Sequence, residues 1–144
     1  MLASRSTLAE FGDRRKMDST SIASVRIGRA LILCVEDDQT QRELLKEVLT
    51  LDGFAVIQAS TAEEALQTLR EAPVSLVIAD HMLRGTTGTQ LASDMKTIKP
   101  TVPIVLHSGT QPDNLHKVDA FIHKGEPVPN FLALIRNLVA RFSS

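Results

Sequence analysis

The sequence predicts an α/β fold in which one parallel β-sheet of five strands is covered by helices on both faces. Two observations predict it. Short runs rich in β-branched residues alternate with longer segments whose apolar residues recur at helical spacing. Most of the short runs are apolar throughout, which is typical of strands buried on both faces of a parallel sheet. The five predicted strands are residues 30–35, 54–59, 74–79, 102–107 and 120–123.

Long helical patterns follow the first, second, third and fifth of these strands. The second helix opens with Thr61 and Glu64, the spacing of a capping box that satisfies backbone N–H groups at a helix start. The other three helices each show one apolar face. These faces consist of Leu44, Leu45, Val48 and Leu49 in the first; Leu91, Ala92, Met95 and Ile98 in the third; and Phe131, Leu134, Ile135, Leu138, Val139 and Phe142 in the last.

The composition predicts one globular domain and excludes several classes of partner. With 144 residues and 43% hydrophobic residues, the chain suffices for one core, which we expect over residues 29–144 after a flexible arm of residues 1–28. The net charge of −1 predicts no direct nucleic-acid partner, and no stretch is apolar enough to span a membrane. The single cysteine, Cys34, lies in an apolar run, so we expect it to be a core residue. A lone cysteine without a disulfide partner also favours a reducing compartment, the cytoplasm.

Polar side chains stand at the ends of four of the predicted strands. Glu36 and Asp37 end the first strand, Asp80 the third, Ser108 the fourth and Lys124 the fifth. In a doubly wound, flavodoxin-like sheet with strand order 2-1-3-4-5, the first and third strands are neighbours, and ligands bind beyond the carboxyl ends of the strands. We therefore expect these five side chains to share one edge of the sheet.

Three consecutive acids, Glu36, Asp37 and Asp38, need a physical explanation. Like charges about 5 Å apart repel by roughly 3 kcal/mol at an effective dielectric constant near 20. A divalent cation with oxygen ligands would offset that repulsion, and Mg²⁺ suits a site with few carboxylates. The sequence therefore predicts a magnesium site formed by Glu36, Asp37 and Asp80, whereas Asp38 is expected to cap the helix that follows.

These features together resemble the receiver domain of two-component response regulators, of the stand-alone type similar to chemotaxis regulators. The resemblance rests on four motifs: "VEDD" followed by Arg42, "VIADHMLRGTTG", "PIVLHSG" and "AFIHKG". It covers residues 30–142. It implies a flavodoxin-like fold and a phosphorelay protein that takes a phosphoryl group from the phosphohistidine of a histidine kinase or histidine phosphotransfer protein. Such a protein is a phosphoacceptor switch rather than a turnover enzyme, and it signals through contacts with a downstream protein.

The resemblance assigns a role to each residue of the predicted site. Asp80 is implied as the phosphoacceptor. Glu36 and Asp37 match the metal-binding acid pair, with Asp37 the direct ligand and Glu36 acting partly through water, and the main-chain carbonyl of Met82 is implied as a further Mg²⁺ ligand. Phosphoryl transfer needs in-line positioning and charge neutralisation, which a metal ion, a lysine and a hydroxyl group supply.

The remaining site residues lie on the fourth and fifth strands. Ser108 matches the hydroxyl that bonds the phosphoryl group, Lys124 the ammonium that pairs with it, and Phe121 the aromatic residue that moves with the switch. The sequence departs from the family at Arg84, where proline is usual, and at Gly125, where proline follows the lysine. These departures bear on the geometry of the site and leave its chemistry intact.

The interval between Ser108 and Phe121 is shorter than in most receivers. Because Pro112 fits only near a helix start, we expect a shortened fourth helix of one or two turns in this interval.

Two other functions fit parts of the pattern. The chain could be a pseudo-receiver that acts as an interaction module without phosphorylation, although Asp37, Asp80, Ser108 and Lys124 are all present. A phosphatase with an aspartate nucleophile is a more distant alternative, because that class places its nucleophile on the first strand, where this chain has Glu36.

Overall fold

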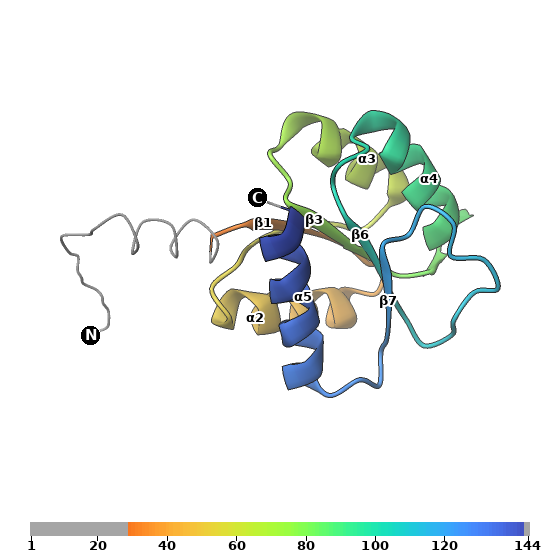
Figure 1. The fold of residues 1–144 in the computed structure, drawn as a ribbon. Coiled ribbons are helices and arrows are strands. Elements are labelled where there is room, and N and C mark those ends of the chain that lie inside the picture. Colours follow the sequence, from red (N-terminus) through yellow and green to blue (C-terminus); the bar gives the residue numbers. More distant parts are fainter. Residues whose placement is uncertain (1–28, 143–144) are drawn as a thin grey trace.

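The computed structural model describes residues 29–142, and the predicted arm, residues 1–28, lies outside this range. Eleven helices and strands make up the described part (Figure 1). In chain order they are β1 (Leu31–Val35), α2 (Gln39–Leu51), β2 (Ala55–Ala59), α3 (Ala62–Glu71), β3 (Leu76–Ala79), β4 (Met82–Leu83), β5 (Thr86–Thr87), α4 (Gly88–Ile98), β6 (Ile104–Ser108), β7 (Ala120–His123) and α5 (Val128–Phe142).

The main sheet has five parallel strands in the order β2-β1-β3-β6-β7. This confirms the predicted flavodoxin-like order, since β6 and β7 are the fourth and fifth predicted strands. Val35 pairs in register with Ala59 and Ala79. The strands therefore end at one common edge, where the polar residues that follow them are brought together.

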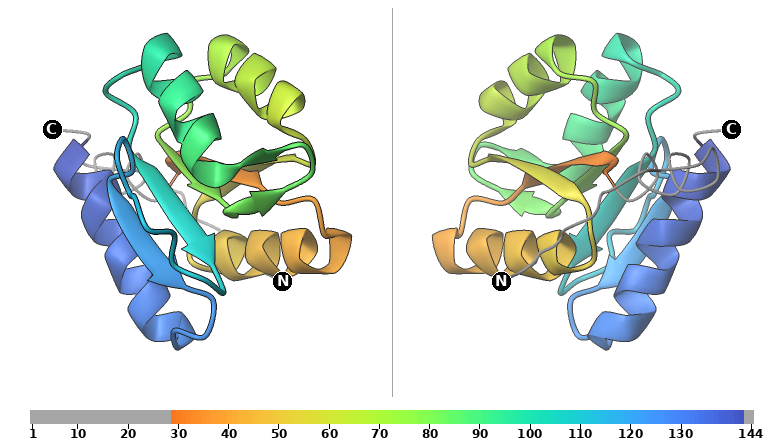
Figure 2. Two further views of the ribbon diagram at one scale, coloured as in Figure 1. Left: turned by 90° about the vertical axis from the view of Figure 1, so that its right-hand side faces the viewer. Right: turned by 90° about the vertical axis from the view of Figure 1, so that its left-hand side faces the viewer.

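Helices cover both faces of the sheet (Figure 2). The sheet divides the hydrophobic core into two clusters, one on each face. Because successive strand residues point to opposite faces, Leu33 and Val35 pack towards α3 and α4, whereas Ile32 and Cys34 pack towards α2 and α5. Cys34 is fully buried, and burial raises the pKa of its thiol to about 12. The prediction that Cys34 is a core residue is confirmed.

Side-chain caps begin the helices where the sequence predicts them. Asp38 Oδ2 accepts a hydrogen bond from the Gln41 N–H at 3.0 Å and so caps α2. Thr61 Oγ1 accepts from the Glu64 N–H at 3.1 Å and caps α3. Glu64 reaches back to the Ser60 N–H at 2.8 Å, one residue earlier than in a standard capping box.

The predicted short fourth helix is not formed, and that detail of the prediction was wrong. Residues 109–119 cross from β6 to β7 through turns and bends. The crossing must run back along a five-residue strand, about 16 Å, and a helix advances only about 1.5 Å per residue, so an eleven-residue connection has no room for a helix plus its turns. Asn114 Oδ1 instead accepts from the His116 N–H at 2.8 Å, and Lys117 has a positive φ of 72°.

Asp119 fixes the end of this connection to the sheet and to α4. Its Oδ2 accepts hydrogen bonds from the Ile104 N–H at 2.7 Å and from Lys96 Nζ at 2.8 Å. Lys96 also donates to the Val102 carbonyl at 2.9 Å. One carboxylate thus joins α4, the start of β6 and the start of β7, where the connection has no helix of its own.

His107 packs between the sheet and α5. Its ring lies 5.1 Å, centroid to centroid, from the ring of Phe131. Burial, and to a lesser extent the positive charge of Lys124, lowers the pKa of His107 to about 4. His107 therefore stays neutral in the folded protein well below the pH at which a free histidine is protonated.

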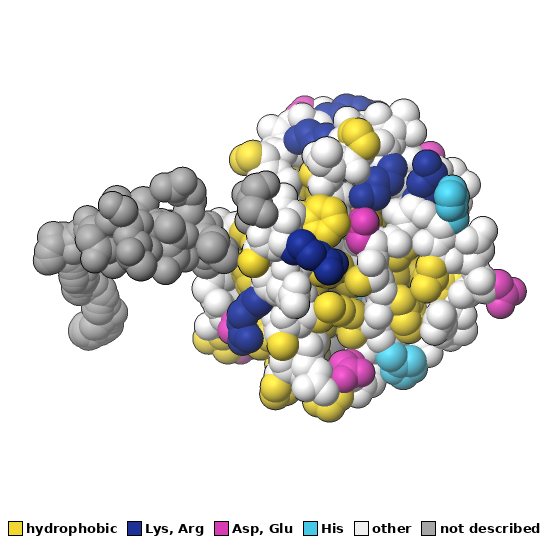
Figure 3. Space-filling model, viewed as in Figure 1, with side chains coloured by type: hydrophobic (Ala, Val, Ile, Leu, Met, Phe, Trp, Pro, Cys, Tyr) yellow, Lys and Arg dark blue, Asp and Glu magenta, His cyan; other side chains and the backbone are white. Residues whose placement is uncertain are grey.

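Hydrophobic side chains reach the surface at several places. In the view of Figure 3 they lie over α2 and α5 and towards β7. The large exposed ones among the described residues are Leu44, Leu51, Met82, Val128 and Phe142. Within residues 29–142, no helix combines the length and the apolar character needed to cross a membrane.

We predict that Asp119→Ala lowers the free energy of unfolding by about 1–2 kcal/mol, because the Ile104 N–H and the Lys96 ammonium lose an acceptor. Urea denaturation measures the change. Asp113→Ala in the same connection is the matched control, because Asp113 is exposed and makes no hydrogen bond or ion pair with the rest of the described chain. Equal stability of the two variants would contradict the role given to Asp119.

We also predict that His107 makes the protein less stable in mild acid. Its folded pKa lies below the unfolded value, so the unfolded chain binds more protons between about pH 6.5 and 4, and stability falls as the pH falls through this window. From pH 7 to pH 5 the loss due to His107 is about 2 kcal/mol. In urea denaturation at pH 7 and pH 5, the free energy of unfolding of His107→Gln should fall by about 2 kcal/mol less than that of wild type. His116→Gln, at an exposed position, is the control and should show the same fall as wild type.

Candidate functional site

Three carboxylates meet beyond the carboxyl ends of β1 and β3. Oxygen atoms of Glu36, Asp37 and Asp80 all lie within 4.8 Å of one another. Glu36 is only 4% exposed, while Asp37 and Asp80 are half-buried. The sequence-based expectation that these acids converge is therefore met in the structure.

Lys124 brings the only ammonium that pairs with this cluster among the described residues. Its Nζ lies 3.0 Å from Glu36 Oε1 and 3.3 Å from Asp80 Oδ2, and it also donates a hydrogen bond to Gln41 Oε1. Burial by itself would lower the pKa of Lys124, but the hydrogen bond and charge of Glu36, together with Asp80, outweigh burial and raise it. Lys124 is therefore charged at neutral pH.

Glu36 is held from several sides. Its Oε2 accepts from the Asp38 N–H at 3.1 Å, and its main-chain carbonyl accepts from Arg42 Nη1 at 2.8 Å. Burial raises the pKa of the Glu36 carboxyl, and the hydrogen bonds from Lys124 and Asp38 reduce that rise without cancelling it. Arg42 thus has a structural part in shaping the loop that presents the acids.

A small hairpin that the sequence did not predict lies beside Asp37. Strands β4 and β5 pair antiparallel, and Gly85 in their turn has a positive φ of 80°, which glycine adopts without strain. The turn places the Arg84 N–H 3.1 Å from Asp37 Oδ2, with Arg84 Nε at 4.0 Å. Gly85 in "LRGTTG" was the only sequence signal for this turn. Nothing in the sequence indicated a contact between Arg84 and Asp37.

Met82 and Gly88 shape the main chain around Asp80. The Met82 N–H lies 3.4 Å from Asp80 Oδ1, and the Met82 side chain is 65% exposed beside the site. At Gly88 a Cβ atom would lie 2.5 Å from the Asp80 carbonyl oxygen and 2.7 Å from a methyl carbon of Leu106. Glycine is needed at position 88 because α4 begins in contact with the end of β3.

Ser108 and Phe121 are not hydrogen-bonded to the acid cluster within the described chain. Ser108 is 2% exposed, and its Oγ is 3.4 Å from the Thr110 N–H, a long hydrogen bond. The Ser108 carbonyl accepts from the Lys124 N–H at 2.9 Å, which holds the ends of β6 and β7 together. Phe121 is half-buried, pairs in register with Leu106, and points to the α3–α4 face of the sheet.

The donor set of this site fits a hard divalent cation. Three carboxylates and one ammonium leave a formal charge of about −2, which the exposed Arg84 guanidinium, 4.0 Å from Asp37, offsets only in part. Carboxylate oxygens are preferred ligands of Mg²⁺. The cluster contains no histidine, in agreement with the packing of His107 against Phe131. Asp80 adds a carboxylate, a group that can act as a nucleophile, beside an ammonium that can stabilise the charge of a transferring group.

Curated relatives match the chain over part of their length. Response regulator protein FleR of Pseudomonas aeruginosa is 39% identical over 77 residues, which is 54% of this chain and 16% of FleR. Regulatory protein VirG of Agrobacterium tumefaciens is 30% identical over 112 residues, which is 73% of this chain and 42% of VirG. The chain thus spans less than half the length of either relative.

Solved structures share the fold over nearly their whole length. A CheY-like response regulator receiver domain protein from Methanospirillum hungatei superposes with a TM-score of 0.76 at 24% identity, covering 80% of this chain and 97% of that one. Response regulator protein TrrA from Thermotoga maritima, in complex with Mg²⁺-BeF, gives a TM-score of 0.72 at 26% identity, covering 76% and 98%.

The match to a protein family includes the acid cluster and Lys124. Residues 32–125 match the family described as response regulator receiver domain, and this range runs from β1 to the residue after Lys124. Sheet order, site geometry and sequence similarity agree. The chain therefore belongs to the response regulator receiver domain family.

Proposed function

We propose that this chain is a phosphoacceptor switch that takes a phosphoryl group from a phosphohistidine onto Asp80 and passes the signal to a partner protein. The observation that carries the proposal is the position of the Asp80 carboxylate. It lies 3.3 Å from the Lys124 ammonium and shares a cluster with Glu36 and Asp37, in a chain of the receiver family.

In the proposed reaction Asp80 is the nucleophile. A carboxylate oxygen of Asp80 attacks the phosphorus atom, the P–N bond of the phosphohistidine breaks as the O–P bond forms, and the imidazole leaves with the electron pair of that bond. The Met82 N–H and Lys124 orient the carboxylate through its two oxygens. Lys124 then donates a hydrogen bond to a phosphoryl oxygen and stabilises its charge.

Glu36, Asp37 and the main-chain carbonyl of Met82 are the proposed holders of Mg²⁺, with Asp80 as a fourth ligand. When bound, the ion supplies positive charge that neutralises the transferring group. The oxygen donors of this chain suit it, and the Thermotoga relative was solved in complex with Mg²⁺-BeF. The same donors explain why three acids are tolerated at one edge of the sheet.

Ser108 and Phe121 are the proposed switch residues. Among the described residues, the Ser108 hydroxyl is bound only by a long hydrogen bond from the Thr110 N–H, so it can turn to a phosphoryl oxygen at little cost. The connection 109–119 starts directly after Ser108 and lacks a helix. It ends directly before β7, whose second residue is Phe121. A shift of Ser108 would therefore change the surface of this connection, where a partner can read it.

Mass spectrometry tests the proposal directly. Acetyl phosphate with Mg²⁺ should add one phosphoryl group to wild type, none to Asp80→Asn, and one to the control Asp38→Asn, whose carboxylate caps α2. Labelling that persists in Asp80→Asn would show that Asp80 is not the acceptor. No labelling of wild type would favour the alternative that the chain is a phosphorylation-independent interaction module.

We predict that Mg²⁺ raises the melting temperature, since it relieves repulsion in the folded state only. At ten times its dissociation constant, ligand linkage stabilises by about 1.4 kcal/mol, or roughly 5 °C for a domain of this size. Thermal denaturation with and without Mg²⁺ should show this shift in wild type and in Asp113→Ala, and little of it in Asp37→Ala. A full shift in Asp37→Ala would exclude Asp37 as a ligand.

We predict that Met82 slows loss of the phosphoryl group. Its exposed apolar side chain stands two positions after Asp80 and offers no group to orient a water molecule. Met82→Asn introduces an amide that can do so, and the phosphorylated variant should hydrolyse several-fold faster than wild type. Leu51→Asn, an exposed position at the end of α2, is the control. Equal hydrolysis in all three proteins would refute the screening role.

A further inference from the structure

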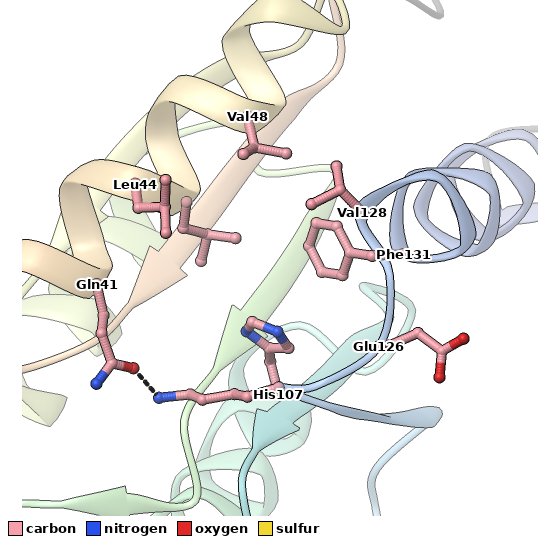
Figure 4. Close-up of a pocket in the computed structure, with 9 residues that line it drawn as sticks. Gln41, Leu44, Val48, His107, Glu126, Val128 and Phe131 are labelled. Carbon is pink, nitrogen blue, oxygen red and sulfur yellow. Dashed lines mark hydrogen bonds between the residues drawn. The ribbon is translucent and has the colours of Figure 1, made fainter.

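The Lys124 ammonium has three N–H donors and three acceptors. Two acceptors are the carboxylates of Glu36 and Asp80, and the third is the side-chain oxygen of Gln41 in the first turn of α2. The dashed line in Figure 4 marks this third hydrogen bond. Gln41 is exposed and uncharged, and no motif in the sequence connected it to the site.

The stem of Lys124 is not packed on all sides. It lines a cavity of about 370 Å³ whose walls include Leu44 and Val48 of α2 and Phe131 of α5 (Figure 4). The Lys124 side chain is 24% exposed, so packing holds part of it and leaves part of it beside open space. The groups that the ammonium bonds therefore complete its positioning.

Gln41 is well placed to serve as one of these groups. Its backbone N–H is bound to the Asp38 cap at 3.0 Å, so the first turn of α2 is held in place. The Asp38 N–H in turn bonds Glu36 Oε2, and Glu36 Oε1 bonds Lys124. The four residues form a closed ring of hydrogen bonds in which Gln41 completes the link to Lys124.

We propose that Gln41 is a positioning residue that fixes the Lys124 ammonium for contact with the phosphoryl group on Asp80. This inference rests on the proposed function. Glu36 and Gln41 hold two of the three N–H groups, and the bond to Asp80, the longer of the two to carboxylates, is exchanged for one to a phosphoryl oxygen. Without Gln41, water takes the second N–H and the ammonium loses its fixed position.

Beryllofluoride binding in the presence of Mg²⁺ tests the proposal, because this phosphoryl mimic needs no kinase. Gln41→Met keeps the length of the side chain and removes the acceptor. ¹⁹F NMR should show beryllofluoride bound about fivefold more weakly than in wild type, the effect of one hydrogen bond. Gln39→Met is the matched control, since Gln39 lies in the same turn and its amide bonds Glu43 instead.

A second readout separates positioning from a general effect on the helix. In ¹⁵N NMR spectra of the lysine side chains, the Lys124 signal, assigned by its loss in Lys124→Arg, should change in Gln41→Met and not in Gln39→Met. Weaker beryllofluoride binding with this spectral change supports the proposal. Unchanged or tighter binding in Gln41→Met overturns it, as does equal weakening in Gln39→Met.

The failure of the proposed function gives a different result. If wild type binds no beryllofluoride, or if Asp80→Asn binds it as well as wild type does, then the assignment of Asp80 fails, and the role of Gln41 fails with it. If wild type binds and Asp80→Asn does not, the assignment of Asp80 stands whatever Gln41→Met does.

Discussion

The structure depends on one electrostatic constraint: three carboxylates share an edge of the sheet with a single ammonium. The parallel strand order imposes this arrangement, because β1, β3 and β7 all end there. Lys124 pairs with Glu36 and Asp80 but reaches no oxygen of Asp37 within hydrogen-bonding distance. The excess negative charge makes this edge a place for cations and for chemistry that needs them.

Much of the surrounding structure can be understood as support for that edge. The Asp38 N–H and Arg42 hold Glu36, the Arg84 N–H holds Asp37, and the Met82 N–H reaches Asp80. Three of these contacts come from backbone N–H groups, which position a side chain without adding another full charge. Arg42 instead donates to the main-chain carbonyl of Glu36. The closely packed start of α4 at Gly88 leaves the end of β3 little freedom to move.

The sequence predicted what depends on local pattern and on strand order. Apolar runs fixed the strands, and the rule that ligands bind at the carboxyl ends of parallel strands placed Glu36, Asp37 and Asp80 together. Prediction from the sequence failed for features that depend on distances between separate elements. The span from Ser108 to Ala120 allows turns but no helix, and the reach of Gln41 to Lys124 or of Arg84 to Asp37 depends on how separate elements pack.

The most direct test of the central claim is a calorimetric titration of wild type and Lys124→Gln with Mg²⁺. If the ammonium offsets part of the negative charge of a metal-binding acid cluster, its removal leaves more charge for the ion, and Lys124→Gln should bind Mg²⁺ several-fold more tightly than wild type. No saturable binding by wild type, or equal or weaker binding by Lys124→Gln, would contradict the account.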